Sequence, residues 1–266
     1  MADIQATYVV DEGRSDLTPF ECMNPIILKD RRQVLEVMES SKAAMWIAPR
    51  KEGLWWTVSA LTELRVPARH SMLALEVFSP KSLVVLPALF HRVVCCPPVR
   101  LLPRKELAEV MAWEGRADMC IGGVVESRPG VVTLYRGNLQ PVSMPLSFFK
   151  SPFPGLVADA SRFEVTHYGQ VLRFGNYGVN FEDVLYAYDT DFRRAKKAQR
   201  IVEDSTFGGA LRRLRKQAGL RRGDFPGVSE RTVARIERGE VRRPHGRTLH
   251  ILAKKLGMTV EALERY

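Results

Sequence analysis

The sequence predicts a multidomain α+β protein: a mixed α/β and β-rich N-terminal region, then an all-α domain of about five short helices. Three observations support this fold class. Residues 30–41 and 104–113 have the apolar spacing of amphipathic helices. Residues 118–186 alternate between short apolar runs and turns that contain Gly or Pro. Residues 207–265 return to helical spacing, interrupted by glycines where helices are expected to end.

Basic charge is concentrated near the C-terminal end of the chain. The 266 residues include 40 Lys and Arg against 30 Asp and Glu, which gives a formal net charge of +10. Residues 205–266 contain 15 of the basic and 6 of the acidic residues, and so account for +9 of that charge. A strongly basic segment on a nearly neutral body predicts a polyanionic partner for that segment.

The composition predicts a soluble cytoplasmic protein. The first 20 residues lack a basic stretch followed by an apolar one, as a signal peptide would have. The most apolar run, residues 82–99, is interrupted by prolines and charged residues, so no membrane span is expected. The four cysteines lack the spacing of a disulfide scaffold, which fits a reducing compartment.

Residues 1–110 are predicted to form a mixed α/β domain of unknown role. Residues 1–24 are expected to be a polar lead-in, and residues 30–41 and 104–113 to be helices. Three mostly apolar runs with β-branched or aromatic residues are expected to be strands: residues 54–58, 73–78 and 82–86.

Residues 111–189 are predicted to form a β-rich domain, whose last strand is expected over residues 181–189. The pattern ends in a Gly-containing hairpin and the pair Leu185 and Tyr186. In this it is similar to a family of small uncharacterised β-rich domains that are fused to DNA-binding modules, a resemblance that implies no activity. Residues 190–204 lack helix breakers and are predicted to be a linker helix.

Residues 205–266 carry the most specific pattern in the chain. Phe207, Leu211 and Leu214 share one face of a predicted helix, and Gly219 follows it as a stop signal. Ser229 is the expected N-cap of a short second helix. On that helix Val233 and Ile236 are expected to face inward, and five residues to face outward: Glu230, Arg231, Ala234, Arg235 and Arg238.

Four pieces of this segment resemble the lambda-repressor-like, Cro/CI-type (XRE) helix-turn-helix family: LRRLRKQAGL, GVS, TVARIERG and TLHILAKKLGM. The resemblance covers residues 207–263. It implies a compact helical domain in which a supporting helix holds a recognition helix in the major groove of double-stranded DNA.

The segment before GVS departs from the family pattern. About three residues are missing there relative to the family, and Phe225-Pro226 replaces a Leu-Ala-type pair. Because Pro226 cannot continue a helix interior, we expect a supporting helix about one turn shorter than usual, with Phe225 in the core.

The resemblance also implies roles for individual residues. The base-contacting candidates are Glu230, Arg231, Thr232 and Arg235, because Arg can bind guanine with two hydrogen bonds and Glu can accept one from cytosine. The phosphate-contacting candidates are Arg222, Ser229, Arg238, Arg242 and Arg243. Arg215 and Glu237 match positions that form an internal ion pair in the family.

A solvated basic face is the simplest alternative for this segment, but such a face rarely carries an ordered series of cap, turn and recognition-helix signals. RNA binding would favour exposed aromatic residues, of which the segment has few. We therefore expect a sequence-specific transcriptional regulator that represses, and that dimerises through residues 1–190. Its N-terminal region is expected to bind a ligand or partner. An antitoxin-like autoregulator that binds a toxin, and an enzyme tethered to DNA, are the alternatives.

No catalytic or metal-binding motif is found. The sequence contains no HExxH, GxSxG, GxxxxGK[ST] or GxGxxG motif, so we expect neither enzymatic activity nor a cofactor. His91 with Cys95 and Cys96 is expected to be incidental, because adjacent cysteines on a strand point in opposite directions. Three tryptophans near Arg50 and Lys51 are candidates for a ligand pocket, but core packing is expected for them: Trp46, Trp55 and Trp56.

Overall fold

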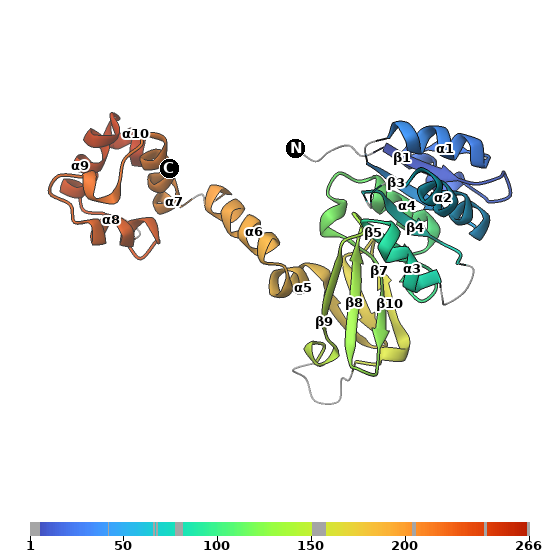
Figure 1. Ribbon diagram of the computed structural model, residues 1–266. Coiled ribbons are helices and arrows are strands. Elements are labelled where there is room, and N and C mark those ends of the chain that lie inside the picture. Colours follow the sequence, from blue (N-terminus) through green and yellow to red (C-terminus); the bar gives the residue numbers. More distant parts are fainter. Residues whose placement is uncertain are drawn as a thin grey trace. The chain divides into compact units, whose positions relative to one another are not determined.

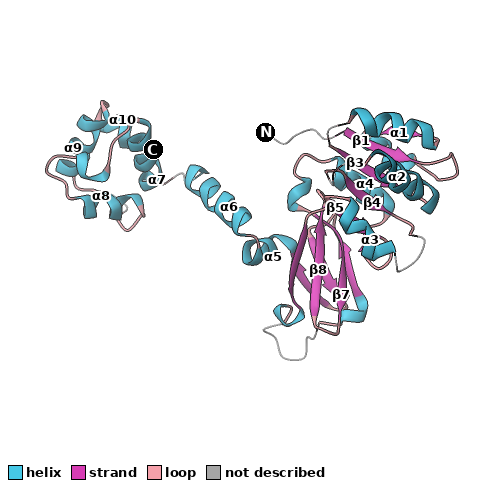
Figure 2. Cartoon of the chain, in the orientation of Figure 1, coloured by secondary structure: helices cyan, strands magenta, loops and turns pink. Residues whose placement is uncertain are grey.

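The computed structural model describes residues 6–41, 43–65, 67, 69–77, 82–150, 158–203, 206–241 and 244–264, without the side chains of residues 82, 83 and 200–203. The chain divides into two compact units, Met1–Asp189 and Thr190–Tyr266 (Figure 1). The described strands all lie in the first unit, and the described part of the second unit is helical (Figure 2). No described helix is long and apolar enough to cross a bilayer.

A five-stranded parallel sheet forms the centre of the first half of the N-terminal unit. Its strands lie in the order β2-β1-β3-β4-β5. Their bounds are β1 Ala6–Val10, β2 Ile26–Leu28, β3 Ala44–Ala48, β4 Ser71–Ala74 and β5 Arg92–Cys95. The central strands β3 and β4 are buried along their whole length, as expected for a parallel sheet covered on both faces.

Three helices cover one face of this sheet: α1 (Arg31–Ser40), α2 (Lys51–Leu64) and α3 (Ser82–Leu89). They connect strands that step in one direction across the sheet, and right-handed crossovers place such helices on one side. Side chains of all three share a buried cluster with Tyr8, Trp46 and Met72 of the sheet. The connection from β1 to β2 steps the other way and contains the 3-10 helix η1 (Thr18–Met23), which packs against α4 (Arg104–Ala112).

Two antiparallel sheets form the rest of the N-terminal unit. One has the order β6-β7-β8-β9, with β6 Arg100–Leu101, β7 Cys120–Glu126, β8 Val131–Arg136 and β9 Pro141–Pro145. The other contains β10 Phe163–Thr166, β11 Val171–Phe174 and β12 Tyr177–Asn180. Short 3-10 helices lie at Arg116–Asp118 (η2), Leu146–Phe148 (η3) and Ala160–Arg162 (η4). β10 packs against β6 and β7, and the rings of Phe149 and Phe163 lie within 5.1 Å of Phe174.

Four sequence-based expectations for this unit are wrong. Residues 1–24 contain β1 and η1 rather than a polar lead-in. Residues 54–58, 82–86 and 181–188, expected to be strands, lie in α2, α3 and α5 (Phe181–Tyr188). These last three segments are short and mostly apolar, and the periodicity of such a segment does not distinguish a buried strand from a buried helix. The helices expected at 30–41 and 104–113 are present as α1 and α4, the second of which spans residue 110.

The C-terminal unit begins with α6 (Thr190–Glu203) and continues with α7 (Phe207–Gln217), η5 (Arg222–Asp224), α8 (Glu230–Glu237), α9 (Gly246–Leu256) and α10 (Val260–Glu264). Its core joins Leu211 of α7, Val233 of α8 and Leu252 of α9. Among the described residues, the segment expected to hold a shortened supporting helix has only the 3-10 turn η5. Phe225 is 1% exposed and fills the core behind that turn.

Candidate nucleic-acid interface

Helix α8 is positioned by its N-cap and by a close contact with α7. The Ser229 hydroxyl accepts a hydrogen bond from the Thr232 backbone N–H at 3.1 Å, which satisfies a free donor of the first turn. Gly208 of α7 lies so close to α8 that a Cβ atom there would be 2.2 Å from the Ile236 carbonyl oxygen. Val233 and Ile236 are buried between these helices. The rotation of α8 about its axis is therefore fixed.

A buried cluster of charges joins α7, η5 and α8. The Arg215 Nε donates to Glu237 Oε1 at 2.5 Å, and the Arg222 Nε donates to Glu237 Oε2 at 2.8 Å. Arg215 also donates to the Leu220 carbonyl at 2.7 Å, so its guanidinium is held on two sides. Burial raises the pKa of Glu237, but hydrogen bonds from Arg215 and Arg222 outweigh it, and the pKa lies below its usual value. The structure thus brings together the expected ion pair and adds Arg222 to it.

The outward face of α8 presents the charged residues singled out from the sequence. Glu230, Arg231 and Arg235 are exposed. Thr232 is half-buried, and its hydroxyl lies 2.8 Å from that of Ser229, so the cap occupies it. Ala234, expected to face outward, is buried. It follows Val233, which is fully buried in the core of the unit.

The phosphate candidates are found in different surroundings. Ser229 and Arg238 are exposed at the two ends of α8. Arg222 is half-buried, and its Nε donates to Glu237; no other side-chain partner is found for it within the described residues. Arg242 and Arg243 lie outside the described residues.

Glu240, directly after α8, is a residue that the sequence reasoning missed. Its carboxylate accepts from the Arg235 Nε at 3.1 Å and from the Arg238 Nε at 2.6 Å. Its backbone N–H donates to the Arg235 carbonyl, and Gly239 before it has a φ of 75°. The hydrogen bond from Arg238 and that from Arg235 lower the pKa of Glu240, so its charge persists beside both arginines. The position of Glu240 directly after the helix-ending Gly239 could have indicated from the sequence that it lies near the last turn of α8.

The other residues weighed from the sequence do not assemble into a site. Trp46 is buried as expected, whereas Trp55 is 56% exposed on α2 and does not belong to the core. Cys95 is buried and Cys96 is half-buried. Within the described residues, no three or more His, Cys, Asp or Glu side chains are grouped so that they could hold a metal ion.

Residues 206–265 match a family model described as a helix-turn-helix domain. The match covers the segment from the N-cap of α7 to the end of α10. It indicates that the C-terminal unit binds DNA. The chain shows no significant similarity to a curated protein or to a solved structure.

Proposed function

We propose that the protein is a sequence-specific DNA-binding transcriptional repressor of the lambda-repressor-like type. The observation that carries the proposal is the exposed row of Glu230, Arg231 and Arg235 on α8, a helix held in one orientation by the Ser229 cap and the Gly208 contact. Arginine and glutamate on such a helix read base edges in the major groove, and each good pair contributes roughly 1–3 kcal/mol of discrimination.

The charge distribution supports the same function. The segment 205–266 carries +9 of the formal net charge of +10 and is therefore attracted to DNA phosphates. This attraction is the same for every DNA sequence. Phosphate contacts set the register of the domain, and α8 then supplies the base preference. Arg238, exposed at the C-terminal end of α8, is placed to make such a phosphate contact.

The regulator is proposed to act as a homodimer on two half-sites. One recognition helix of eight residues reads few bases, and two-fold dimers of such domains contact half-sites roughly 34 Å apart. The N-terminal unit, which the helix-turn-helix match does not cover, supplies the dimer contact and binds an effector or partner.

Binding of full-length protein to DNA from upstream of its own gene tests the function. Fluorescence anisotropy against a scrambled fragment, over a salt series, separates base preference from phosphate attraction. We expect a preference for the cognate fragment that persists at moderate salt, with two chains bound per site. Equal and steeply salt-sensitive binding to both fragments would contradict sequence-specific regulation.

Substitution of single arginines tests the separate roles. Arg235→Ala should weaken binding to the preferred sequence by roughly 10- to 100-fold and leave scrambled DNA nearly unaffected, because it removes a base contact. Arg242→Ala should weaken binding to all sequences alike and reduce the salt slope by about 1. Equal effects of both variants on both fragments would refute this division of roles.

A further inference from the structure

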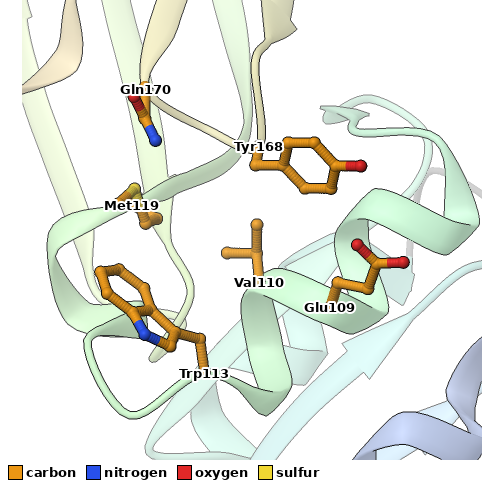
Figure 3. A pocket seen from close by; sticks show the side chains of 6 residues that line it. All are labelled: Glu109, Val110, Trp113, Met119, Tyr168 and Gln170. Atoms are coloured by element: carbon orange, nitrogen blue, oxygen red, sulfur yellow. The ribbon is translucent and has the colours of Figure 1, made fainter.

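The N-terminal unit has a pocket that the helix-turn-helix function does not use. It lies between the C-terminal end of α4 and the loop that joins β10 to β11, and its volume is about 200 Å³. Six side chains line it: Glu109, Val110, Trp113, Met119, Tyr168 and Gln170. Figure 3 shows Trp113 and Tyr168 on two sides of one hollow, with Val110 between them and Glu109 near Tyr168. A cavity of this size suits a ligand smaller than a typical drug molecule.

Both aromatic rings are placed by the backbone rather than by burial of the rings. Trp113 is 51% exposed, and its ring packs over Gly115, where a Cβ atom would lie 2.6 Å from it. Tyr168 is 49% exposed and has a φ of 53°, a left-handed conformation that an aromatic residue rarely adopts. The Tyr168 N–H donates to the Glu106 carboxylate at 3.2 Å. The next residue, Gly169, accepts from the Cys120 N–H at 3.0 Å.

Both aromatic residues remain about half exposed, so the fold leaves apolar surface of each in contact with water. Tyr168 in addition has a left-handed backbone, which is unfavourable for a residue with a Cβ atom. Strain that holds an exposed side chain in place is a feature of ligand sites. A ligand seated between the rings would bury the surface that the fold leaves open.

The polar groups around the pocket define the ligand that it would take. In the part of the chain that the structure describes, the Glu109 carboxylate has no hydrogen bond or ion pair, and the side-chain amide of Gln170 has none either. Aromatic faces attract cations through their negative π-surfaces, Trp most strongly. A carboxylate near Tyr168, in a pocket that Trp113 lines from the other side, favours a positive charge and disfavours an anion.

From this geometry we infer that the pocket binds a small organic cation, such as a quaternary ammonium or an alkylated amine. The cationic group lies between Trp113 and Tyr168, and Glu109 neutralises its charge. Val110 and Met119 contact the hydrocarbon part of the ligand. The binding itself concerns the N-terminal unit alone, whereas its use as an effector site rests on the proposed regulatory function.

Calorimetric titration of the full-length protein with choline tests the site. The matched control ligand is the neutral analogue in which a tert-butyl group replaces the trimethylammonium group, since it has the same shape without the charge. We expect choline to bind about tenfold more tightly than the analogue, in line with a cation held by aromatic rings. Equal affinity for both ligands, or no binding of choline or tetramethylammonium, would overturn the proposal.

Variants locate the binding in the pocket. Glu109→Gln, Trp113→Leu and Tyr168→Asn should each weaken choline binding by about five- to thirtyfold. Asn tolerates the left-handed backbone, so Tyr168→Asn removes the ring without disturbing the loop. Glu39→Gln, an exposed charge change on α1, is the control and should bind as the unaltered protein does. Unchanged binding of choline by Glu109→Gln would refute a cation site.

The titration is done without DNA, so its outcome is independent of operator binding. If the protein binds choline but shows no base preference, the cation site is supported and the proposed regulatory function is refuted. If the protein shows base preference but does not bind choline, the cation site is refuted and the proposed regulatory function is supported. Addition of choline to the operator titration then shows whether the two units are coupled.

Discussion

A buried carboxylate of the C-terminal unit and a buried imidazole of the N-terminal unit are accommodated in opposite ways. In the C-terminal unit, Arg215 and Glu237 are buried as a charged pair, and Arg222 adds a further hydrogen bond. In the N-terminal unit, His70 is fully buried, and neither of its ring nitrogens has a hydrogen-bond partner among the described residues. Its ring instead meets Trp46 edge to face, with the centroids 5.8 Å apart.

The C-terminal unit is stabilised by the ionised form of Glu237, whereas the N-terminal unit is stabilised by the neutral form of His70. Hydrogen bonds to Glu237 outweigh the effect of burial and lower its pKa. Desolvation lowers the pKa of His70 from 6.5 to about 4, and the Arg69 charge adds to that effect. The first group stabilises its unit while it is ionised, and the second while it is neutral.

Removal of Glu237 should have the largest effect, because it leaves the Arg215 charge buried without a partner. We expect Glu237→Leu to lower the free energy of unfolding of the C-terminal unit by about 3–5 kcal/mol. Urea unfolding followed by circular dichroism measures this change. The four tryptophans all lie in the N-terminal unit, so their fluorescence transition should not move.

Glu261→Leu, an exposed acid on α10, is the control and should change stability little. A loss below 1 kcal/mol for Glu237→Leu would show that the pair does not hold the unit together.

The second prediction concerns a feature of both units, a helical glycine that lies against the backbone of a neighbouring element. A Cβ atom at Gly53 would lie 2.2 Å from the Val10 carbonyl oxygen, the same distance as at Gly208 and Ile236. Gly53→Ala and Gly208→Ala should each destabilise their own unit by about 1–3 kcal/mol, because a helix must move away from the backbone it touches. Tryptophan fluorescence should detect the first variant and circular dichroism both.

Gly223 has no atom within 4 Å of an added Cβ, and Gly223→Ala is therefore the control. If either buried variant were as stable as the control, the close approach at that position would not limit the packing.

The third prediction is a difference in acid response. Because the folded pKa of His70 lies below its unfolded value of 6.5, its contribution is present above pH 6.5 and is lost as the pH falls toward 4. The N-terminal unit should lose about 2 kcal/mol between about pH 7.5 and about pH 5. The Glu237 contribution persists in that range and is lost only below about its usual pKa of 4.5.

Urea titrations of tryptophan fluorescence at the two pH values measure the loss in the N-terminal unit. His70→Leu should remove most of this pH dependence, whatever its stability at neutral pH. An equal pH dependence in this variant would assign the effect to another group.

The smallest effect is expected at the exposed charges. Glu240 also pairs with two arginines, but it is exposed, so Glu240→Gln should hardly change stability, unlike Glu237→Leu. It should instead strengthen binding to scrambled DNA by about two- to fivefold at low salt, since Arg238 is released to phosphates. Anisotropy titrations measure this change. Weaker binding of scrambled DNA would contradict it.

The C-terminal unit was predictable because its signals are local. Ser229 caps α8, Gly239 and Gly257 follow helices with left-handed backbones, and the apolar positions recur at helical spacing. The turn η5 was less predictable, because Pro226 excludes a long helix without specifying what replaces it.

In the N-terminal unit, the outcome depended on partners far away in the chain. The run at residues 6–10 is a strand because β2 and β3 pair with it, and the run at 82–86 is helical because it bridges β4 and β5. The pocket shows the same limit. Glu109 lies in the last turn of α4 and Trp113 directly follows the helix, but Tyr168 reaches them through the hairpin between β10 and β11, which no local signal indicates.

Helix α4 limits where segments of this chain can be exchanged with those of another protein. It packs against η1 beside the parallel sheet and also against β7 of an antiparallel sheet, so it belongs to both halves of the N-terminal unit. In a chimaera joined at either end of α4, one half of the N-terminal unit would lose the helix that covers part of its buried surface. The joint after Asp189 lies between the two compact units. Exchange of whole DNA-reading units is therefore compatible with this architecture, whereas exchange of halves within residues 1–189 is not.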